Sequence, residues 1–580
     1  MPRTSCTITF GLYDTTARQD ASYETDDKQP FVNFEDFKRE EGISVPKFAT
    51  LEQNQFLLDG TFELFPDEPA GMEWGLWSRS MSDGSGNFAT PPKLVISFSE
   101  NHTSPGLTLY FYKPTDDFIN NLIVRWYDEF GNLISTNQSY PDGTKYFISN
   151  SITDYRRIEI EFISTNNPYR FLKLAGIDFG RMVIFASDGL ISAKVLEEID
   201  PTAASISINT LETEVYSTDK DFSLLDPQGM FSLLQQQQRL DVTETVNGES
   251  IYMGAYYLDT WDEASENSLK LTAVDKIGII DKTNFYGGIY DNILSGELIA
   301  QIMDSAGAEY DLDESLRDIP LSGHLPIASH RVALQQVALV IGAYVDCSRS
   351  DAIKIYSPPM VASILVERSR IFLGSSIGLR ELVTGVNVTS HRFVKNQEST
   401  DLLEDTLPAG QYEVTFSSPA HSLEISSGAS IVESNVNYAI INVERAGEVV
   451  LTGLGYTDSQ IVFKKRAKSL PANATQNTLS VENATLVSAA NANNVAERIY
   501  DYYQKRYEFN FEVVANGEEN GDYVMVNSLR GEYLRGGIEA MEINLTGGFL
   551  ANIKLAGVRA STTMGYYVGE LYANEAWGVI

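Results

Sequence analysis

The sequence predicts a multidomain, mainly β protein with α+β parts. At 580 residues the chain is too long for one hydrophobic core. Its 30 Tyr and 28 Phe residues far outnumber its 5 Trp residues, and residues typical of strands recur throughout. Short alternating segments are frequent: in 157–163, Ile158, Ile160 and Phe162 fall on one face of a strand. We therefore expect several β-rich domains.

The N-terminal part divides into an arm and a β-sandwich. Residues 1–50 are polar and irregular, which predicts an extended arm or a loosely packed edge. Between residues 51 and 185 short strands alternate with turns; 93–98 and 107–111, for example, flank a turn-like stretch at 101–106. Evenly spaced strands without helices predict a jelly-roll-like antiparallel sandwich.

The middle of the chain has a mixed α+β pattern. Strand patterns at 251–258 and 268–274 indicate a β-barrel domain over 186–290, and an α+β domain follows over 291–390. The spacing of apolar residues predicts a helix over 295–306.

A second helix is expected at 330–341, with Ser329 as its N-cap and Gly342 at its end. The strand patterns at 344–347 and 352–356 then predict a hairpin around residues 348–351.

The C-terminal third combines strands with one helix. Residues 391–475 again show short strands and indicate a small inserted β domain. Over 476–580 we expect a helix, capped by Asn493 or Asn494 and running to Arg506, followed by a second β-barrel domain.

The charge balance excludes one class of partner. The chain has 43 Lys and Arg residues against 79 Asp and Glu residues, a formal net charge of −36. A duplex-binding protein needs a cationic surface to displace counterions, so we expect no stable nucleic-acid binding. The acidity serves either solubility or a repulsive wall past which DNA slides, and the sequence does not separate the two.

The sequence indicates no catalytic, metal or cofactor site. Cys6 and Cys347 are the only cysteines, which is too few for a disulfide framework or a zinc site and fits assembly in a reducing compartment. Residues 1–10 lack the pattern of a signal peptide, and no apolar run is long enough to span a membrane. His324 and His330 have no nearby ligands at metal-site spacing, and the nucleophile, zinc-protease and phosphate-loop motifs are missing.

One group of residues is a candidate ligand site. Trp74 and Trp77 can form an aromatic shelf for sugar rings, with Arg79 as a polar neighbour. Core packing is the favoured interpretation of the same aromatic residues, and the sugar shelf is kept as the alternative.

Several stretches, taken in order, resemble the hub proteins of phage tails. The segments that carry the resemblance are 207–211, 222–227, 253–261, 271–276 and 326–343 in the middle of the chain, and 495–503, 521–526 and 541–549 near its end. The sandwich over 51–185 departs from simple hubs and looks like a galactose-binding-like module.

The resemblance implies a function and a set of partners. It implies a homotrimer whose two β-barrel domains per chain build a ring under the tail tube, lining a channel for DNA and the tape-measure protein. It further implies contacts to a distal tail or tail-tube protein and to tail fibre or tip proteins, in a virion assembled in the bacterial host cytoplasm. The alternatives are a carbohydrate- or receptor-binding tail adhesion protein that recognises a host surface glycan, and a cell-wall-degrading enzyme. We expect the protein to have no enzymatic activity.

Overall fold

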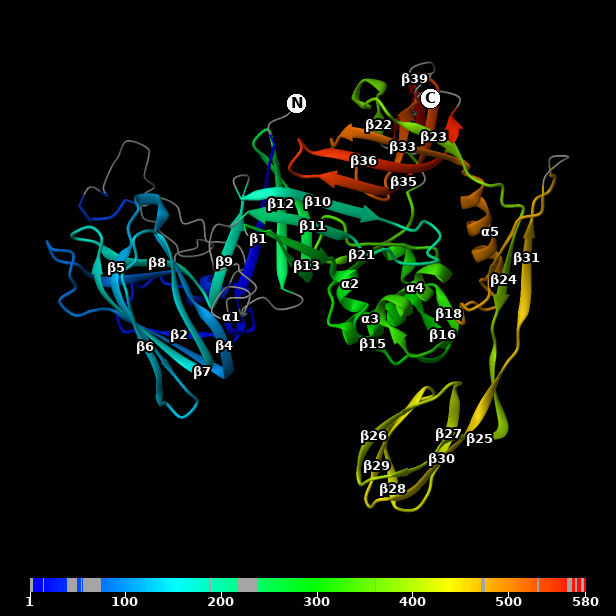
Figure 1. Ribbon diagram of the computed structural model, residues 1–580, viewed down its shortest axis with the longest axis horizontal. Helices are drawn as coiled ribbons and strands as arrows, with labels where there is room; N and C mark the ends of the chain where they lie inside the picture. Colours follow the sequence, from blue (N-terminus) through cyan, green and yellow to red (C-terminus); the bar gives the residue numbers. More distant parts are fainter. Residues whose placement is uncertain are drawn as a thin grey trace. The chain divides into compact units, whose positions relative to one another are not determined.

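A computed structural model describes most of the chain as two compact units (Figure 1). The described residues are 4–13, 15–38, 49–53, 55, 75–186, 189–216, 238–265, 267–359, 361–362, 364–470, 475–528, 531–560, 566–568, 571–574 and 578–579. Unit 1 comprises residues 1–8, 185–223 and 239–580, and unit 2 comprises residues 9–184 and 224–238. Strands β1 (Thr4–Tyr13) and β9 (Gly180–Phe185) each extend across the division between the units.

The predicted fold class is confirmed. Strands make up 56% of the protein and helices 12%, and most strand pairs are antiparallel. Within the described part of the chain, no helix is both long and apolar enough to cross a bilayer.

Unit 2 contains a seven-stranded antiparallel sheet in the order β3-β8-β4-β7-β5-β6, with β2 on β4. Its strands are β2 (Ser22–Glu24), β3 (Leu76–Met81), β4 (Lys93–Phe111), β5 (Ile119–Tyr127), β6 (Leu133–Ser139), β7 (Lys145–Thr165) and β8 (Phe171–Asp178). Strands β4 and β7 are long and pair along most of their length. Alternate residues of every long strand are buried in a shared core that includes Ile96, Leu109, Trp126, Ile160 and Leu174.

Residues of the expected N-terminal arm are part of this unit. They form α1 (Thr15–Asp20), β2 and a 3-10 turn at Phe34–Lys38, and Ala17, Ala21 and Phe37 are buried in the unit 2 core. A second 3-10 turn lies at Lys113–Thr115.

Unit 1 is built on a large sheet in the order β23-β33-β36-β35-β10-β11-β14-β13-β12. The strands are β10 (Leu190–Glu198), β11 (Thr210–Tyr216), β12 (Arg239–Val246), β13 (Glu249–Ser265), β14 (Ser268–Val274), β23 (Ser376–Leu379), β33 (Tyr507–Val514), β35 (Tyr533–Asn544) and β36 (Leu550–Ala560). β34 (Tyr523–Asn527) pairs with β35, and β22 (Ile364–Val366) runs parallel to β34.

The two strand groups expected to form separate barrels join in this one sheet. Strand β10 of the first group pairs antiparallel with β35 of the second, with Lys194 opposite Asn544 and Val195 opposite Ile543. The main chain is therefore hydrogen-bonded continuously from one group to the other.

A helical part packs beside this sheet within unit 1. Its helices are α2 (Lys276–Ile280), α3 (Ser295–Ala306), α4 (His330–Ile341) and α5 (Ala492–Tyr503). Short strands accompany them: β15 (Asn284–Phe285), β16 (Gly288–Leu294), β17 (Tyr310–Leu312), β18 (Pro320–Leu325), β19 (Ala328–Ser329), β20 (Tyr344–Asp346) and β21 (Ile353–Tyr356), with 3-10 turns at Glu314–Leu316 and Arg368–Arg370. Leu298, Ile302, Leu334 and Val337 from α3 and α4 share one core with Val495 of α5.

A small β domain projects from this part on a ribbon of strands (Figure 1). The ribbon comprises β24 (Gly385–Ser390), β31 (Ile461–Arg466) and β32 (Thr478–Val481). Two three-stranded sheets follow, formed by β25 (Phe393–Leu407), β26 (Gly410–Thr415), β27 (Ala420–Ile425), β28 (Ala429–Ser434), β29 (Tyr438–Val443) and β30 (Gly447–Asp458). They enclose a separate core around Ile441 and Leu451.

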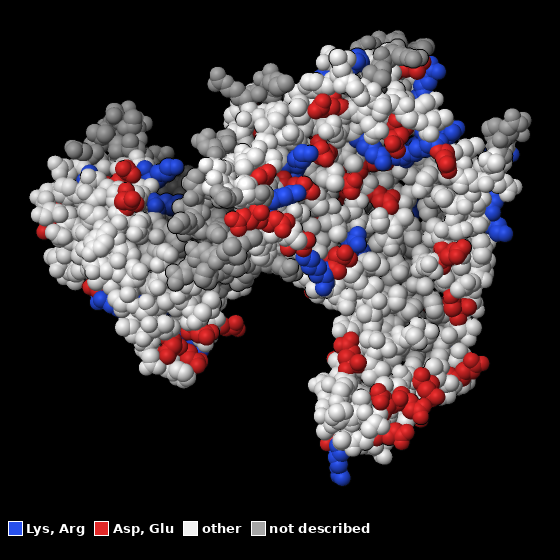
Figure 2. Space-filling view, viewed as in Figure 1, with Lys and Arg blue, Asp and Glu red and all other residues white. Residues whose placement is uncertain are grey.

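The surface of the small β domain is strongly acidic. Lys395 and Arg445 are the only Lys or Arg residues between 393 and 458. Asp and Glu side chains crowd the face seen in Figure 2.

Near the C-terminus, β37 (Tyr566–Val568), β38 (Leu571–Asn574) and β39 (Gly578–Val579) form a short antiparallel sheet.

Candidate functional site

Strand β3 of unit 2 carries two of the three predicted ligand residues. Side chains alternate across a strand, so Leu76 is buried in the unit 2 core while Trp77 lies on the opposite face of the sheet. There Trp77 packs with Tyr112 and Ala175 and is only 2% exposed. Trp74 lies outside the described residues.

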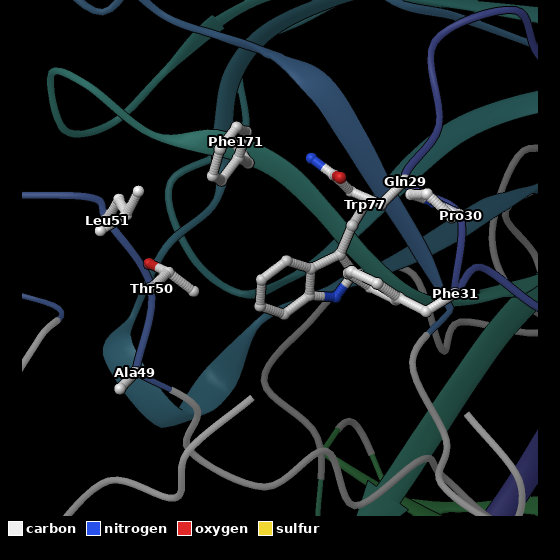
Figure 3. A pocket seen from close by; sticks show the side chains of 8 residues that line it. All are labelled: Gln29, Pro30, Phe31, Ala49, Thr50, Leu51, Trp77 and Phe171. Carbon is white, nitrogen blue, oxygen red and sulfur yellow. The ribbon is translucent and has the colours of Figure 1, made fainter. Parts of the chain in front are cut away.

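The edge of Trp77 forms a wall of a pocket with a volume of about 520 Å³ (Figure 3). The lining residues are Gln29, Pro30, Phe31, Ala49, Thr50, Leu51, Trp77 and Phe171. Figure 3 shows the indole at the centre, with Phe31 on one side and Thr50 and Leu51 on the other. The lining is mostly apolar, so the pocket suits an apolar group rather than a polyhydroxylated one.

The faces of the Trp77 ring are already in contact with other side chains. Phe31 and Tyr112 meet it edge-on, at centroid distances of 5.8 and 5.4 Å. The ammonium of Lys173 lies 5.1 Å from the ring centroid, in a cation–π arrangement. A sugar ring therefore has no open face of Trp77 on which to stack, and the indole serves mainly to pack the outer layer of the sheet.

Beneath the pocket lies a buried cluster of charges that the sequence did not indicate. The Lys173 ammonium is 2.8 Å from carboxylate oxygens of both Glu52 and Asp117, and Arg170 lies 2.9 Å from Asp117. The side chains of Lys173, Glu52 and Asp117 are 2%, 0% and 3% exposed. Burial by itself would raise the pKa of Asp117, but the neighbouring Lys173 and Arg170 outweigh it and hold that pKa below its usual value. The cluster ties residues 49–53 to strand β8.

Arg79 lies apart from the Trp77 pocket. It is exposed and lines a second groove of unit 2, with a volume of about 590 Å³, together with Asp26, Asp27 and Lys93. The structure thus places Trp77 and Arg79 at different sites although they are two residues apart on one strand.

Unit 1 presents a mainly polar surface on one side of its large sheet. Directly opposed residues of an antiparallel pair share a face, and the register carries this face from β14 through β11, β10, β35 and β36 to β33. We call it the polar sheet face; its exposed or half-buried polar residues include Lys194, Glu212, Glu214, Lys270, Thr272, Asn510, Glu512, Glu542, Asn544, Asn552 and Lys554. The half-buried apolar residues Leu196, Val514 and Leu550 lie on the same face. Its ion pairs include Lys194–Glu542 at 3.4 Å and Lys270–Glu212 at 3.7 Å. Such exposed pairs contribute little to stability.

The opposite side of the same sheet meets a buried polar network. Glu197 on β10 is fully buried and pairs with Arg349 at 3.0 Å. Asp275 accepts hydrogen bonds from the backbone N–H groups of Asn209 and Gly278 and caps α2. Burial raises the pKa of Asp275 to about 7. These groups are enclosed by protein, which indicates a role in fixing the sheet on the helical part.

The histidines of unit 1 also have structural partners. The His324 Nε2 atom lies 2.7 Å from Oδ1 of Asn437, at the joint between the helical part and the small β domain. His330 begins α4, with its ring near Thr283 and Ser305. Among the described residues no group of three or more His, Cys, Asp or Glu side chains is arranged to hold a metal ion.

Comparison with known proteins gives a likeness of fold only. No family model matches the chain, and no curated protein does. Among solved structures, the chain is similar to the 43 kDa tail protein of prophage MuSo2 from Shewanella oneidensis, with 11% identity, a TM-score of 0.38, and coverage of 63% of this chain and 93% of that one. The tail protein from Neisseria meningitidis MC58 gives 11% identity, a TM-score of 0.39, and coverage of 64% and 92%. Prophage tail protein gp18 from Listeria monocytogenes EGD-e gives 11%, 0.36, and 76% and 95%. All three are described as tail proteins.

Proposed function

We propose that the chain is a structural component of a phage or phage-like tail tip, where it forms a ring-shaped hub that connects the tail tube to tip or fibre proteins. The observation that carries the proposal is the large sheet of unit 1. Two strand groups from distant parts of the sequence join there through β10 and β35, and the polar sheet face extends over both groups. A wall of this kind, repeated by rotation, encloses a channel.

The chemistry of the polar sheet face suits a channel wall past which DNA moves. Its acidic residues include Glu212, Glu214, Glu512 and Glu542, and its lysines include partners in ion pairs with Glu212 and Glu542. Phosphates bind where unpaired cations gather. Paired lysines among glutamates and asparagines offer no such cluster, so a polyanion passes without being held.

The end strand of the sheet provides a surface for ring closure. All four residues of β23 are exposed, and its apolar side chains Ile377 and Leu379 are 42% and 61% exposed. An exposed apolar edge strand is a liability in a free monomer, and a neighbouring copy removes it. In the proposed homotrimer, β23 of each copy contacts the next copy.

The proposed partners follow from the position of a hub in a tail. A distal tail or tail-tube protein lies above the ring, the tape-measure protein lies within its channel, and tail fibre or tip proteins lie below. The protein then acts in the virion after assembly in the bacterial host cytoplasm. We propose no enzymatic activity.

The experiment is a mass measurement by size-exclusion chromatography with light scattering. The proposal predicts a particle of about three times the 64.4 kDa chain mass, alone or with its tail neighbours. The double variant Ile377→Lys/Leu379→Lys places charge on the β23 edge and is expected to shift the particle towards monomer. Val432→Lys is the matched control, because Val432 is also 61% exposed but lies on β28 of the small β domain.

Two results would contradict the proposal. One is a stable wild-type monomer that ignores the tail-tube and tape-measure proteins. The other is a trimer that the β23 double variant leaves intact, because the edge would then lie outside the interface.

A further inference from the structure

The groove that contains Arg79 is a concave surface of unit 2 that a tail hub does not require. It lies where the end of β2, residues 25–27, strand β3 and residues 90–95 meet, and its volume of about 590 Å³ is sufficient for a small ligand. None of its lining residues belongs to the Trp77 pocket.

Hydrogen bonds of Asp27 fix the backbone of the groove. Its Oδ1 atom accepts from the N–H groups of Arg79 at 2.7 Å and Ser80 at 3.0 Å, and its own N–H donates to Oγ1 of Thr25. On the other wall, β2 pairs with β4, so that Glu24 lies opposite Val95. Because main-chain contacts hold both walls, the groove exists before any ligand arrives.

The polar side chains of the groove are available for a ligand. Within the described part of the chain, Glu24, Asp26 and Arg79 make no side-chain hydrogen bond or ion pair. Lys93 approaches only Glu161, at 3.9 Å, and is 59% exposed. The groove therefore contains both donor and acceptor side chains that do not pair with each other.

The mixture of charges selects the class of ligand. An anion would meet Glu24, Asp26 and Asp27, and a cation would meet Arg79 and Lys93, so neither is favoured. A sugar hydroxyl both donates and accepts, and it can bridge a guanidinium and a carboxylate.

An apolar surface completes the match to a sugar. Pro91 and Pro92 line the same groove and offer an apolar contact to the C–H face of a sugar ring. Arg79 thus lines a groove that does not include Trp77.

From this arrangement we propose that the groove formed by Asp26, Arg79, Lys93 and the Pro91–Pro92 wall binds a neutral oligosaccharide. The site gives the tail component a means of contacting a glycan that is independent of ring formation. The proposal therefore goes beyond the hub function and can fail without affecting it.

The test is saturation-transfer NMR and calorimetric titration of the full chain with lactose, cellobiose, chitobiose and maltotriose. Glucuronic acid and a mixed-charge peptide serve as comparison probes. We expect binding of at least one neutral sugar, and Arg79→Gln is expected to weaken it about tenfold or more, because a charge-assisted hydrogen bond is lost. Arg445→Gln is the matched control: Arg445 is exposed, has no side-chain partner among the described residues and lies in the small β domain.

The outcomes are distinct. A neutral sugar whose affinity falls in Arg79→Gln and is unchanged in Arg445→Gln supports the proposal. Absence of binding to all four sugars, preference for glucuronic acid or the peptide, or equal affinity in the two variants overturns it. Retention of the wild-type circular dichroism spectrum and particle mass by Arg79→Gln separates loss of the site from loss of fold or of ring assembly.

Discussion

Replacing Lys173 with methionine tests the buried charge cluster of unit 2 directly. Methionine keeps most of the length and the apolar stem of lysine but removes the ammonium. Glu52 and Asp117 then remain buried, and Arg170, which forms an ion pair with Asp117 and not with Glu52, is the one cation left in the cluster. Breaking a buried ion pair on one side costs about 3–5 kcal/mol, because the remaining charge is neither solvated nor paired.

The magnitude translates into a large thermal shift. For a domain of the size of unit 2, 1 kcal/mol corresponds to about 2–4 °C in Tm, so we expect Lys173→Met to lower the Tm of unit 2 by about 6–20 °C. The cation–π contacts with Trp77 and Tyr112, at 5.1 and 4.9 Å, are lost in the same variant and act in the same direction. Differential scanning calorimetry of the full chain measures the shift.

A control substitution at a second lysine and a double variant test the same reasoning. Lys113→Met is the control, because Lys113 is an exposed lysine of the same unit without a side-chain partner in the described structure. In Lys173→Met/Glu52→Gln the carboxylate that Lys173→Met leaves without a cation is removed, so we expect part of the lost stability to return. A Tm for Lys173→Met within 2 °C of that of Lys113→Met would refute the reasoning.

Three further predictions concern unit 1. Burial raises the pKa of Asp275 to about 7, against 3.8 for the free side chain. Between these two pH values the folded state holds a proton that the unfolded state has released. The contribution of this group to the free energy of unfolding therefore falls by up to about 4 kcal/mol as the pH rises from about 4 to 7. Asp275→Asn should remove this slope in urea titrations at pH 5, 6 and 7, and an unchanged slope would show that Asp275 does not titrate in this range. Asn437→Ala leaves His324 without its partner at the joint of the small β domain, and we expect the free energy of unfolding to fall by about 1–3 kcal/mol. Amide exchange of β29, measured by hydrogen–deuterium mass spectrometry, should become faster. Protection of β29 equal to that of the wild type would argue against a role for this joint. Ser329→Ala removes the cap that accepts from the N–H of Val332 and should cost about 1 kcal/mol in the same urea titrations, whereas no loss would mean that the cap is replaced by solvent.

Local sequence patterns were sufficient for the helices of the central region. The helices expected at 295–306 and 330–341 occur with those bounds, with Ser329 as N-cap and Gly342 in the left-handed conformation at the end. The predicted hairpin is also confirmed, as β20 pairs antiparallel with β21. Caps and apolar spacing are properties of neighbouring residues, so the sequence displays them.

Where local signals are weak, the predictions were less accurate. The last helix was expected to begin after Asn493 or Asn494 and to reach Arg506, but α5 spans Ala492–Tyr503. Its N-cap, Asn491, makes no capping hydrogen bond with its side chain. A helix without a cap has no sharp boundary in its sequence.

Long-range pairing explains the errors in the strands. The expected turn at 101–106 is instead part of the single strand β4, which absorbs the irregularity in register shifts against β7 around His102 and Gly106. The pairing of β10 with β35 joins residues about 350 positions apart, and no local pattern encodes it.

For the candidate site too, the residue types could be identified from the sequence but the contacts between distant residues could not. The aromatic residues and a neighbouring arginine were visible in the sequence. The burial of Trp77, however, depends on Tyr112 and Lys173, which are distant from it in the sequence. The groove around Arg79 likewise depends on Asp27, whose contact with the backbone of β3 joins residues far apart in the chain. Residue type indicated the chemistry, and only the fold determined which residues meet.

Cryo-electron microscopy of the assembled particle tests the central claim most directly. If the unit 1 sheet forms the wall of a hub, the map will show a closed ring with a central opening, and the polar sheet face, marked by Lys194, Glu542 and Asn552, will line that opening. A map in which this face is on the outside of the particle, or is buried against another subunit, would contradict the account.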